Sequence, residues 1–362
     1  MAFFQSKYII ILLQILIIYT YKKNLIIGAI KNYSWDKIKL FFKSLANSQI
    51  DNCDIIMFVN NLNKRTINKI KSYGVMIRKI PNKFKSMRIN NYRYKLYADF
   101  LSNKLDKYQI ILATDVRDVI FQKDIFKNYG KFNQFLSLAL EDDNISQPIN
   151  KKWMINAFGK NLYKTLENYP IICSGTILGT SDIIYNFFKI IWKEINSSYI
   201  PLPFNSRHDQ TIVNYIIYHF KMFKDYIIAT NNSEGPIMTI GLTLKKNNIS
   251  FDSESNILNG KGEIASVIHQ YDRKKSIIKI LLNKYDSNNS KIIKKSKVIN
   301  IFYIIIFIIA FFICIIISSI ILTFFLYIKI GFLKNIKIYL KKCKILFSFL
   351  LISKSLDLKK LI

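Results

Sequence analysis

Residues 107–121 read KYQIILATDVRDVIF. The apolar run at its start predicts a buried strand. Asp115, Arg117 and Asp118 then place three charges within four positions, and the sequence turns apolar again directly after them. Two carboxylates this close repel each other unless a cation or a base compensates them. The partner of these charges therefore decides what this stretch does.

Upstream of this stretch, short apolar runs alternate with segments of helical periodicity. They predict strands over 24–30, 53–60, 75–81 and 108–114 and helices over 35–45, 66–72 and 89–105. This alternation predicts an α/β fold, with a mostly parallel central sheet and helices on both of its faces. Ligands of such sheets bind at the carboxyl ends of the strands, which is where Asp115 and Asp118 stand.

The residues alone allow two interpretations of the acidic stretch. Carboxylate oxygens suit a hard divalent ion such as Mg or Mn, which in turn can hold a diphosphate. Alternatively, Asp115 caps a following turn, while Asp118 and Arg117 form a surface ion pair that contributes at most about 1 kcal/mol. Spacing does not decide between these interpretations.

Composition excludes an unstructured chain and leaves the net charge ambiguous. The 362 residues have 51% hydrophobic content, whereas disorder requires low hydrophobicity. Of the formal net charge of +31, +12 lies from residue 291 onward, and the remaining +19 is spread without a dense basic block. This spread favours a solvated surface over a nucleic-acid face. No helix-turn-helix, RNA-recognition or zinc-binding pattern occurs, so we expect no nucleic acid partner, although a basic membrane protein that binds nucleic acid is a remaining alternative.

Three segments suggest a membrane protein. From 298 to 328 there is no charged residue, a length greater than the roughly 20 apolar residues that cross a bilayer, so we expect a transmembrane helix there. The basic tail over 329–362 would be cytoplasmic by the positive-inside tendency. An apolar run within 1–21 predicts a signal peptide or short signal anchor. Together they predict a single-pass membrane protein whose main domain, 22–290, lies in the lumen of the ER or Golgi.

The stretch LATDVRDVIFQKDIF, residues 112–126, resembles the acidic "DxD" segment of the GT-A type nucleotide-sugar glycosyltransferases. Other stretches fall in the order of that family, namely NLIIGAI, INNYRYKLYADFL, IICSGTILGTSDII, HDQTIVNYII and SVIHQYDRKK. The resemblance extends over roughly residues 22–280. It implies a Rossmann-like fold and the transfer of a sugar from a nucleoside-diphosphate donor to an acceptor hydroxyl of a glycan, a protein or a lipid.

The resemblance also implies a metal site. Asp115 and Asp118 would hold a Mn or Mg ion, and His269 would be its third ligand. Because DVRD separates its acids by two residues, it leaves open which of Asp115 and Asp118 binds the ion directly. Arg117 would neutralise excess acidic charge or contact the donor.

Other site residues are implied in the same way. Asp209 would be the catalytic or acceptor-binding carboxylate, with Gln210 beside it, although the spacing from Ser206 to Asp209 also fits a capping box at a helix start. Contacts to the donor are implied for Asn60, at the nucleotide base, for Arg93, and for Gly175, whose missing Cβ lets the backbone approach the sugar. Whether such an enzyme inverts or retains the anomeric centre is left open. The alternative function is a non-catalytic, membrane-anchored scaffold or binding protein of the same fold.

Overall fold

The computed structural model describes residues 22–241 and 249–286 throughout, and part of the chain between 310 and 344. The chain divides into two units, Met1–Ile293 and Lys294–Ile362, which are described separately. The predicted signal peptide or anchor over 1–21 lies outside the described residues, as does most of the basic tail.

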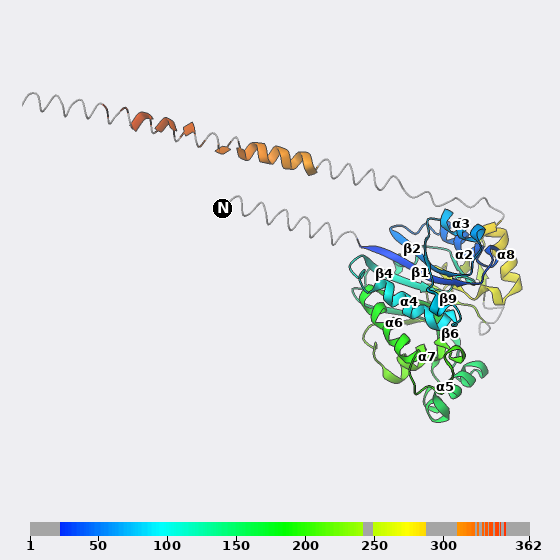
Figure 1. The fold of residues 1–362 in the computed structure, drawn as a ribbon. Coiled ribbons are helices and arrows are strands. Elements are labelled where there is room, and N and C mark those ends of the chain that lie inside the picture. The colour runs from blue at the N-terminus through cyan, green and yellow to red at the C-terminus, as the bar shows by residue number, and fades with distance from the viewer. Residues whose placement is uncertain are drawn as a thin grey trace, which may run out of the picture. The chain divides into compact units, whose positions relative to one another are not determined.

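The first half of the first unit alternates strands and helices as the sequence predicts. Its elements are β1 (Lys23–Lys31), α2 (Trp35–Asn47), β2 (Cys53–Asn60), α3 (Lys64–Ser72), β3 (Met76–Lys79), α4 (Ile89–Leu101) and β4 (Tyr108–Thr114) (Figure 1). Helix α2 begins after Ser34, which occupies the N-cap position without a capping hydrogen bond from its side chain. Helix α3 begins after Asn63, whose side chain accepts a hydrogen bond from the Thr66 N–H at 2.7 Å.

The central sheet has seven strands in the order β3-β2-β1-β4-β7-β6-β8. The second half of the unit contributes β6 (Leu136–Asn144), β7 (Pro170–Thr180) and β8 (Ile227–Thr230). Four neighbouring pairs are parallel, but β7 runs antiparallel to both β4 and β6. The expected fold class therefore needs correction to a mixed α/β sheet, because an apolar run predicts a buried strand without giving its direction.

Helices cover both faces of this sheet because successive side chains of a strand point to opposite faces. Leu25 and Ile27 of β1 pack into a core with residues of α4 and of α6 (Ser181–Ile195). Ile26 and Ile30 of the same strand pack into a second core with residues of α2 and α3. All four side chains are fully buried, and each such burial contributes about 1.5–3 kcal/mol.

A smaller sheet adjoins the carboxyl end of β4. It has the order β5-β12-β9, formed by β5 (Val119–Phe121), β12 (Val267–His269) and β9 (Ile237–Thr239). Strand β12 pairs antiparallel with β5 and parallel with β9. This sheet brings residues near position 269 beside residues near position 119.

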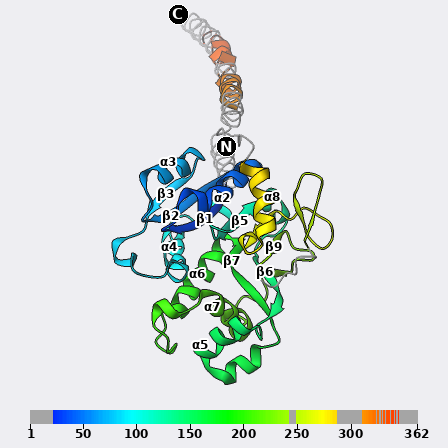
Figure 2. The same cartoon turned by 90° about the vertical axis from the view of Figure 1, so that its right-hand side faces the viewer.

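The remaining elements complete the first unit. They are η1 (Asn82–Phe84), η2 (Ile125–Asn128), α5 (Pro148–Leu166), η3 (Phe204–Ser206), α7 (Asp209–Tyr215), η4 (Ile216–Phe220), β10 (Ser250–Phe251), β11 (Ile257–Leu258), η6 (Tyr271–Arg273) and α8 (Lys275–Asp286). Both views show α5 and α7 at one end of this unit and α3 at the other (Figures 1 and 2). Helix α8 packs on α2.

The structure contradicts the prediction of a transmembrane helix over 298–328. Among the described residues, no helix has both the length and the apolar character needed to span a bilayer. The expected single-pass membrane location is therefore wrong as well, and the expected association with a membrane through a C-terminal helix has no support in the described chain.

Candidate active site

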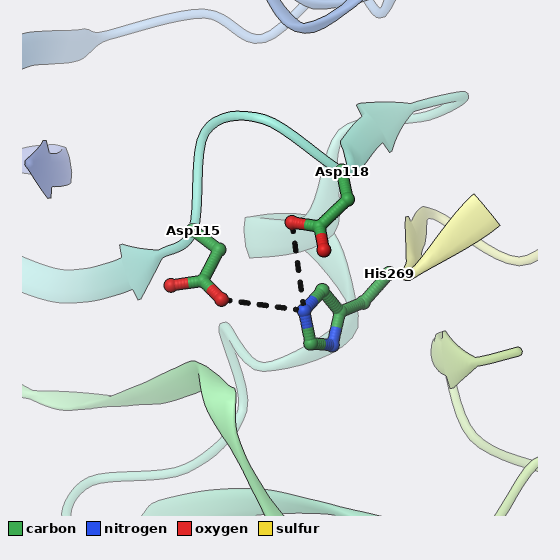
Figure 3. Close-up of side chains that lie close together, drawn as sticks. All are labelled: Asp115, Asp118 and His269. Atoms are coloured by element: carbon green, nitrogen blue, oxygen red, sulfur yellow. Dashed lines mark ion pairs between the residues drawn. The ribbon is translucent and has the colours of Figure 1, made fainter. Parts of the chain in front are cut away.

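Three side chains converge where the two sheets meet. Asp115 directly follows β4, Asp118 directly precedes β5, and His269 ends β12. The pairing of β5 with β12 sets His269 opposite Val119. As a result, His269 Nε2 lies 3.5 Å from Asp115 Oδ2 and 3.9 Å from Asp118 Oδ1 (Figure 3). We call these three residues the Asp-Asp-His cluster.

The imidazole of this cluster has one satisfied nitrogen and one unsatisfied nitrogen. His269 is 1% exposed, and its Nδ1 lies 3.1 Å from Cys173 Sγ. Its Nε2, which faces both carboxylates, is buried and makes no hydrogen bond within the described part of the chain. Buried polar atoms without a partner are uncommon, so this nitrogen calls for a ligand.

The donor atoms of the cluster suit a divalent cation. One ligand atom from each residue can be chosen so that all three lie within 4.8 Å of one another. Carboxylate oxygens and an imidazole nitrogen are ligands that Mn²⁺ and related ions accept, and a single ion can contact all three after small side-chain shifts. The residues present therefore fit the ion that the sequence predicts.

Electrostatics at the cluster favour positive charge between the carboxylates. Burial opposes ionisation of Asp115, but Arg93 and His269 outweigh this effect and hold its pKa below the usual value. Burial alone would lower the pKa of His269, but Cys173, Asp115 and Asp118 raise it well above the usual value instead. A divalent cation would satisfy the same carboxylates that hold the proton on His269.

Gly175 of β7 packs directly against the cluster. Its carbonyl accepts a hydrogen bond from the Asp115 N–H at 2.8 Å. A Cβ at this position would lie 2.3 Å from His269 Cε1, 2.5 Å from Nε2 and 2.9 Å from Asp115 Oδ2. Real Cβ atoms do not make such approaches, so a residue with a side chain here would displace the imidazole or the carboxylate.

Arg93 of α4 connects the cluster to the start of α7. Its guanidinium donates to an oxygen of Asp115, to Asp209 Oδ2 at 2.7 Å and to the Ser174 carbonyl at 2.8 Å. The Tyr94 hydroxyl also donates to Asp209 Oδ2, at 3.1 Å. Arg93 is 6% exposed, and hydrogen bonds of this charged, buried kind are stronger than neutral ones.

Asp209 begins α7, but not through a capping box. The N-cap of α7 is His208, which makes no capping bond with its side chain, and Ser206 lies in η3. The capping interpretation of this spacing is therefore wrong. Gln210, the next residue, donates to Glu141 Oε1 at 3.3 Å and to Asn150 Oδ1 at 3.2 Å.

Arg117 lies beside Asp118, and its side chain is 34% exposed. It donates to Asp118 Oδ2 at 2.9 Å, and its Nε lies 3.3 Å from Asp272 Oδ2. Arg273 approaches Asp118 Oδ2 at 3.9 Å. The Arg117–Asp118 pair expected from the sequence is present, but the Asp118 side chain is only 5% exposed, so this is not a surface pair. Its second oxygen, Oδ1, faces His269.

One cleft of about 370 Å³ contains nearly all of the residues that the sequence singles out. They are Arg93, Asp115, Arg117, Asp118, Gly175, Asp209, Gln210 and His269. Asn60, the remaining predicted site residue, does not line the cleft, and its Nδ2 is buried without a hydrogen-bond partner in the described chain.

The cleft also contains residues that sequence reasoning missed, namely Tyr33, Arg88, Trp153 and His208. Tyr33 stands two residues after β1, and Arg88 is the N-cap of α4. Their positions at element ends were a usable signal, since ligands of α/β sheets gather at these ends. Trp153 and His208 gave no comparable signal, because only the packing of α5 against α7 brings them together.

Comparison with known proteins gives weak similarities only. No protein-family model matches the chain, and no curated protein matches it. The chain is similar to the glycosyltransferase GlyE of Streptococcus pneumoniae TIGR4, with 15% identity and a TM-score of 0.36 over 58% of this chain and 45% of GlyE. It is also similar to an active-site mutant of LgtC, with 12% identity and a TM-score of 0.47 over 74% of this chain and 97% of LgtC.

Proposed function

We propose that this chain is a glycosyltransferase that moves a sugar from a nucleoside-diphosphate donor to an acceptor hydroxyl, with a Mn²⁺ or Mg²⁺ ion in the Asp-Asp-His cluster. The observation that carries the proposal is the convergence of Asp115, Asp118 and the buried His269 Nε2 in the cleft, where this nitrogen faces both carboxylates and makes no hydrogen bond in the described chain. The ion, when bound, would stabilise the negative charge that develops on the departing diphosphate.

The cations of the cleft support an anionic donor. Arg88, Arg93, Arg117 and Arg273 all line it. Guanidinium groups match phosphate oxygens in two-point hydrogen bonds, and they are fully charged at neutral pH. Arg117 and Arg273 adjoin Asp118, so they would lie beside a diphosphate held by the ion.

Asp209 and Gln210 would act on the acceptor side. Arg93 and Tyr94 both donate to Asp209 Oδ2, and Oδ1 accepts no hydrogen bond from the described residues. Oδ1 is therefore the oxygen open to an acceptor hydroxyl. An inverting enzyme would use this carboxylate as the base that deprotonates the hydroxyl, whereas a retaining enzyme would use it to hold the acceptor.

The first test is metal binding. In Asp118→Asn we expect the affinity for Mn²⁺, measured by electron paramagnetic resonance titration, to fall at least tenfold, because a neutral amide is a poorer ligand for a hard cation. Asp99→Asn is the matched control, since this exposed acid on α4 pairs only with Lys95 in the described chain. Equal Mn²⁺ affinity in both variants would rule out the proposed site.

The second test is turnover. The wild-type chain with Mn²⁺ is expected to hydrolyse at least one of UDP-glucose, UDP-galactose, UDP-N-acetylglucosamine and GDP-mannose slowly, and Asp118→Asn is expected to lose that activity. Circular dichroism would show that the variant is folded. Metal binding without hydrolysis of any donor would favour the non-catalytic binding protein instead.

A further inference from the structure

A second groove opens beside the cleft. It has a volume of about 740 Å³, within the roughly 300–1,000 Å³ that ligand sites occupy. We call it the side groove, and it is lined by Arg88, Pro148, Ile149, Lys152, Trp153, Asn156, Leu202, Asn205, Ser206 and His208. One wall is the first two turns of α5, and the other is the segment that contains η3.

The side groove adjoins the cleft. Arg88, Trp153 and His208 line both spaces. His208 directly precedes Asp209, the first residue of α7, and Gln210 lines the cleft as well. A molecule in the side groove would therefore lie next to the residue that precedes Asp209, the carboxylate that we place on the acceptor side.

An aromatic platform stands at the junction. The rings of Trp153 and His208 are stacked with centroids 4.0 Å apart and planes 11° apart. His208 Nδ1 also lies 3.4 Å from an Arg88 terminal nitrogen, so three residues from three segments hold one another in place. The rings are only partly buried, which leaves aromatic surface available to a ligand.

The wall opposite α5 is held rigidly. Asn205 Oδ1 accepts a hydrogen bond from the Arg88 N–H at 2.8 Å, and Asn91 Nδ2 donates to the Phe204 and Arg207 carbonyls at 2.8 and 3.0 Å. The buried Arg207 side chain donates to the Ile200 carbonyl at 3.0 Å, to the Leu202 carbonyl at 2.9 Å and to the carbonyl of Ile195 at the end of α6. A preformed groove loses little conformational entropy when a ligand binds.

The chemistry of the side groove favours a saccharide. The apolar face of a pyranose ring packs on an aromatic face, and its hydroxyls need amide or hydroxyl partners. Besides the platform, the groove offers the amides of Asn156 and Asn205 and the hydroxyl of Ser206, and none of its lining residues is acidic. The groove contains two cations, Arg88 and Lys152, and no carboxylate. This charge disfavours a basic peptide as the ligand and is compatible with a neutral or acidic sugar chain.

We propose that the side groove binds the acceptor and that the acceptor is a saccharide, with a sugar ring on the Trp153–His208 platform and its reacting hydroxyl beside Asp209. This inference rests on the proposed function, but its test does not require turnover. It narrows the acceptor, which the sequence leaves as a glycan, a protein or a lipid, to the first of these.

The test is saccharide binding in the absence of metal and nucleotide. Lactose, maltotriose, cellotriose and chitotriose would be titrated into the full chain by saturation-transfer NMR. At least one should bind with a saturable signal, and Trp153→Leu should weaken that binding at least tenfold. Tyr199→Leu is the control, since Tyr199 is an aromatic residue that is 53% exposed and lies outside both spaces. The affinity of Tyr199→Leu for the same sugar should stay within twofold of wild type.

Circular dichroism melting would establish that Trp153→Leu is folded, and Trp153→Phe, which keeps an aromatic face, should restore most of the affinity. The proposal is overturned if none of the four sugars binds, or if Trp153→Leu binds as tightly as wild type. Because Mn²⁺ titration is a separate measurement, loss of saccharide binding with intact metal binding would contradict only the saccharide acceptor. Saccharide binding without Mn²⁺ binding would instead contradict the metal-dependent transfer.

Discussion

At the scale of single residues, Gly175 sets the spacing within the Asp-Asp-His cluster. A Cβ there would overlap the imidazole of His269 and crowd Asp115. We predict that Gly175→Ala lowers the affinity for Mn²⁺ at least tenfold and destabilises the fold by about 1–3 kcal/mol through overpacking. Metal titration and urea unfolding measure the two effects.

Gly130→Ala is the matched control for this substitution. A Cβ at Gly130 meets no atom within 4 Å, and its backbone does not have a positive φ. The Gly130→Ala variant should therefore bind Mn²⁺ as wild type does. If Gly175→Ala and Gly130→Ala behave alike, the close packing of β7 against His269 has no bearing on the site.

Arg93 is the residue on which the buried charges of the cleft depend. Arg93→Met would leave Asp115 and Asp209 without their shared partner, which costs about 3–5 kcal/mol for a buried ion pair. Arg93→Lys keeps the charge, but one ammonium group cannot reproduce the planar, forked hydrogen bonds of the guanidinium. Its loss of stability should therefore lie between those of wild type and Arg93→Met. Urea unfolding at pH 7 measures both, with Arg78→Met of the edge strand β3 as an exposed control. Equal stability of Arg93→Met and Arg78→Met would contradict this account.

Residue by residue, the sequence identified most of the charged residues that gather in the cleft, but not the contacts that they make. The charges after β4 were identifiable because a buried strand that ends in acids is unusual. The contact of Cys173 Sγ with His269 Nδ1 was not, since 96 residues separate them and only the meeting of β7 and β12 joins them. Asn60 was placed at the site because it ends a parallel strand, but its side chain does not line the cleft.

At the scale of elements, the longer strands and helices of the first unit were predictable and its three-residue strands were not. Strands β1, β2 and β4 and helix α4 lie where the periodicity places them. Strands β5, β9 and β12 have three residues each, which is too short for an alternating pattern of apolar and polar residues to be recognised. Their pairing nevertheless positions His269 beside Asp118, so the local sequence contains the residues of the Asp-Asp-His cluster but not the arrangement that brings them together.

Asp54 ties three elements of the central sheet together. It belongs to β2 and accepts hydrogen bonds from Lys23 of β1 at 2.9 Å and from the Tyr108 hydroxyl of β4 at 3.1 Å, while Lys107 Nζ lies 2.7 Å away. Burial would raise the pKa of Asp54, but Lys107 and Lys23 outweigh this effect and lower it. The resulting stabilisation is present above the unfolded-state pKa of about 3.9 and is lost as the pH falls through the lower folded-state value.

We therefore predict that Asp54→Asn is less stable than wild type by about 1–2 kcal/mol at pH 7, and that this difference shrinks as the pH falls below about 4. Urea unfolding at several pH values between 7 and 3 measures the difference. Asp99→Asn, which removes an exposed pair within α4, should show little pH-dependent difference from wild type. A difference for Asp54→Asn that is constant over this pH range would show that Asp54 is not held ionised by its lysines.

At the scale of the first unit, the Asp-Asp-His cluster joins two sheets. Asp115 continues from the seven-stranded sheet, and His269 ends a strand of the three-stranded sheet. An ion bound to both would stabilise their relative positions in the folded state, while the unfolded chain would keep only the local Asp115 and Asp118 pair. A ligand that binds the folded state preferentially raises its stability by mass action.

Mn²⁺ at about one hundred times its dissociation constant should add about 2.7 kcal/mol, which corresponds to a rise in melting temperature of about 5–10 °C for a unit of this size. Calorimetry with Mn²⁺ and with EDTA measures the rise. In Asp118→Asn, whose affinity is expected to be at least tenfold weaker, the same Mn²⁺ concentration should raise the melting temperature by about half as much or less, because the stabilisation grows with the logarithm of the ratio of ion concentration to dissociation constant. An equal rise in both proteins would place the stabilising ion elsewhere on the chain, and the link between the two sheets would then depend on side-chain packing and on the pairing of β5 with β12 alone.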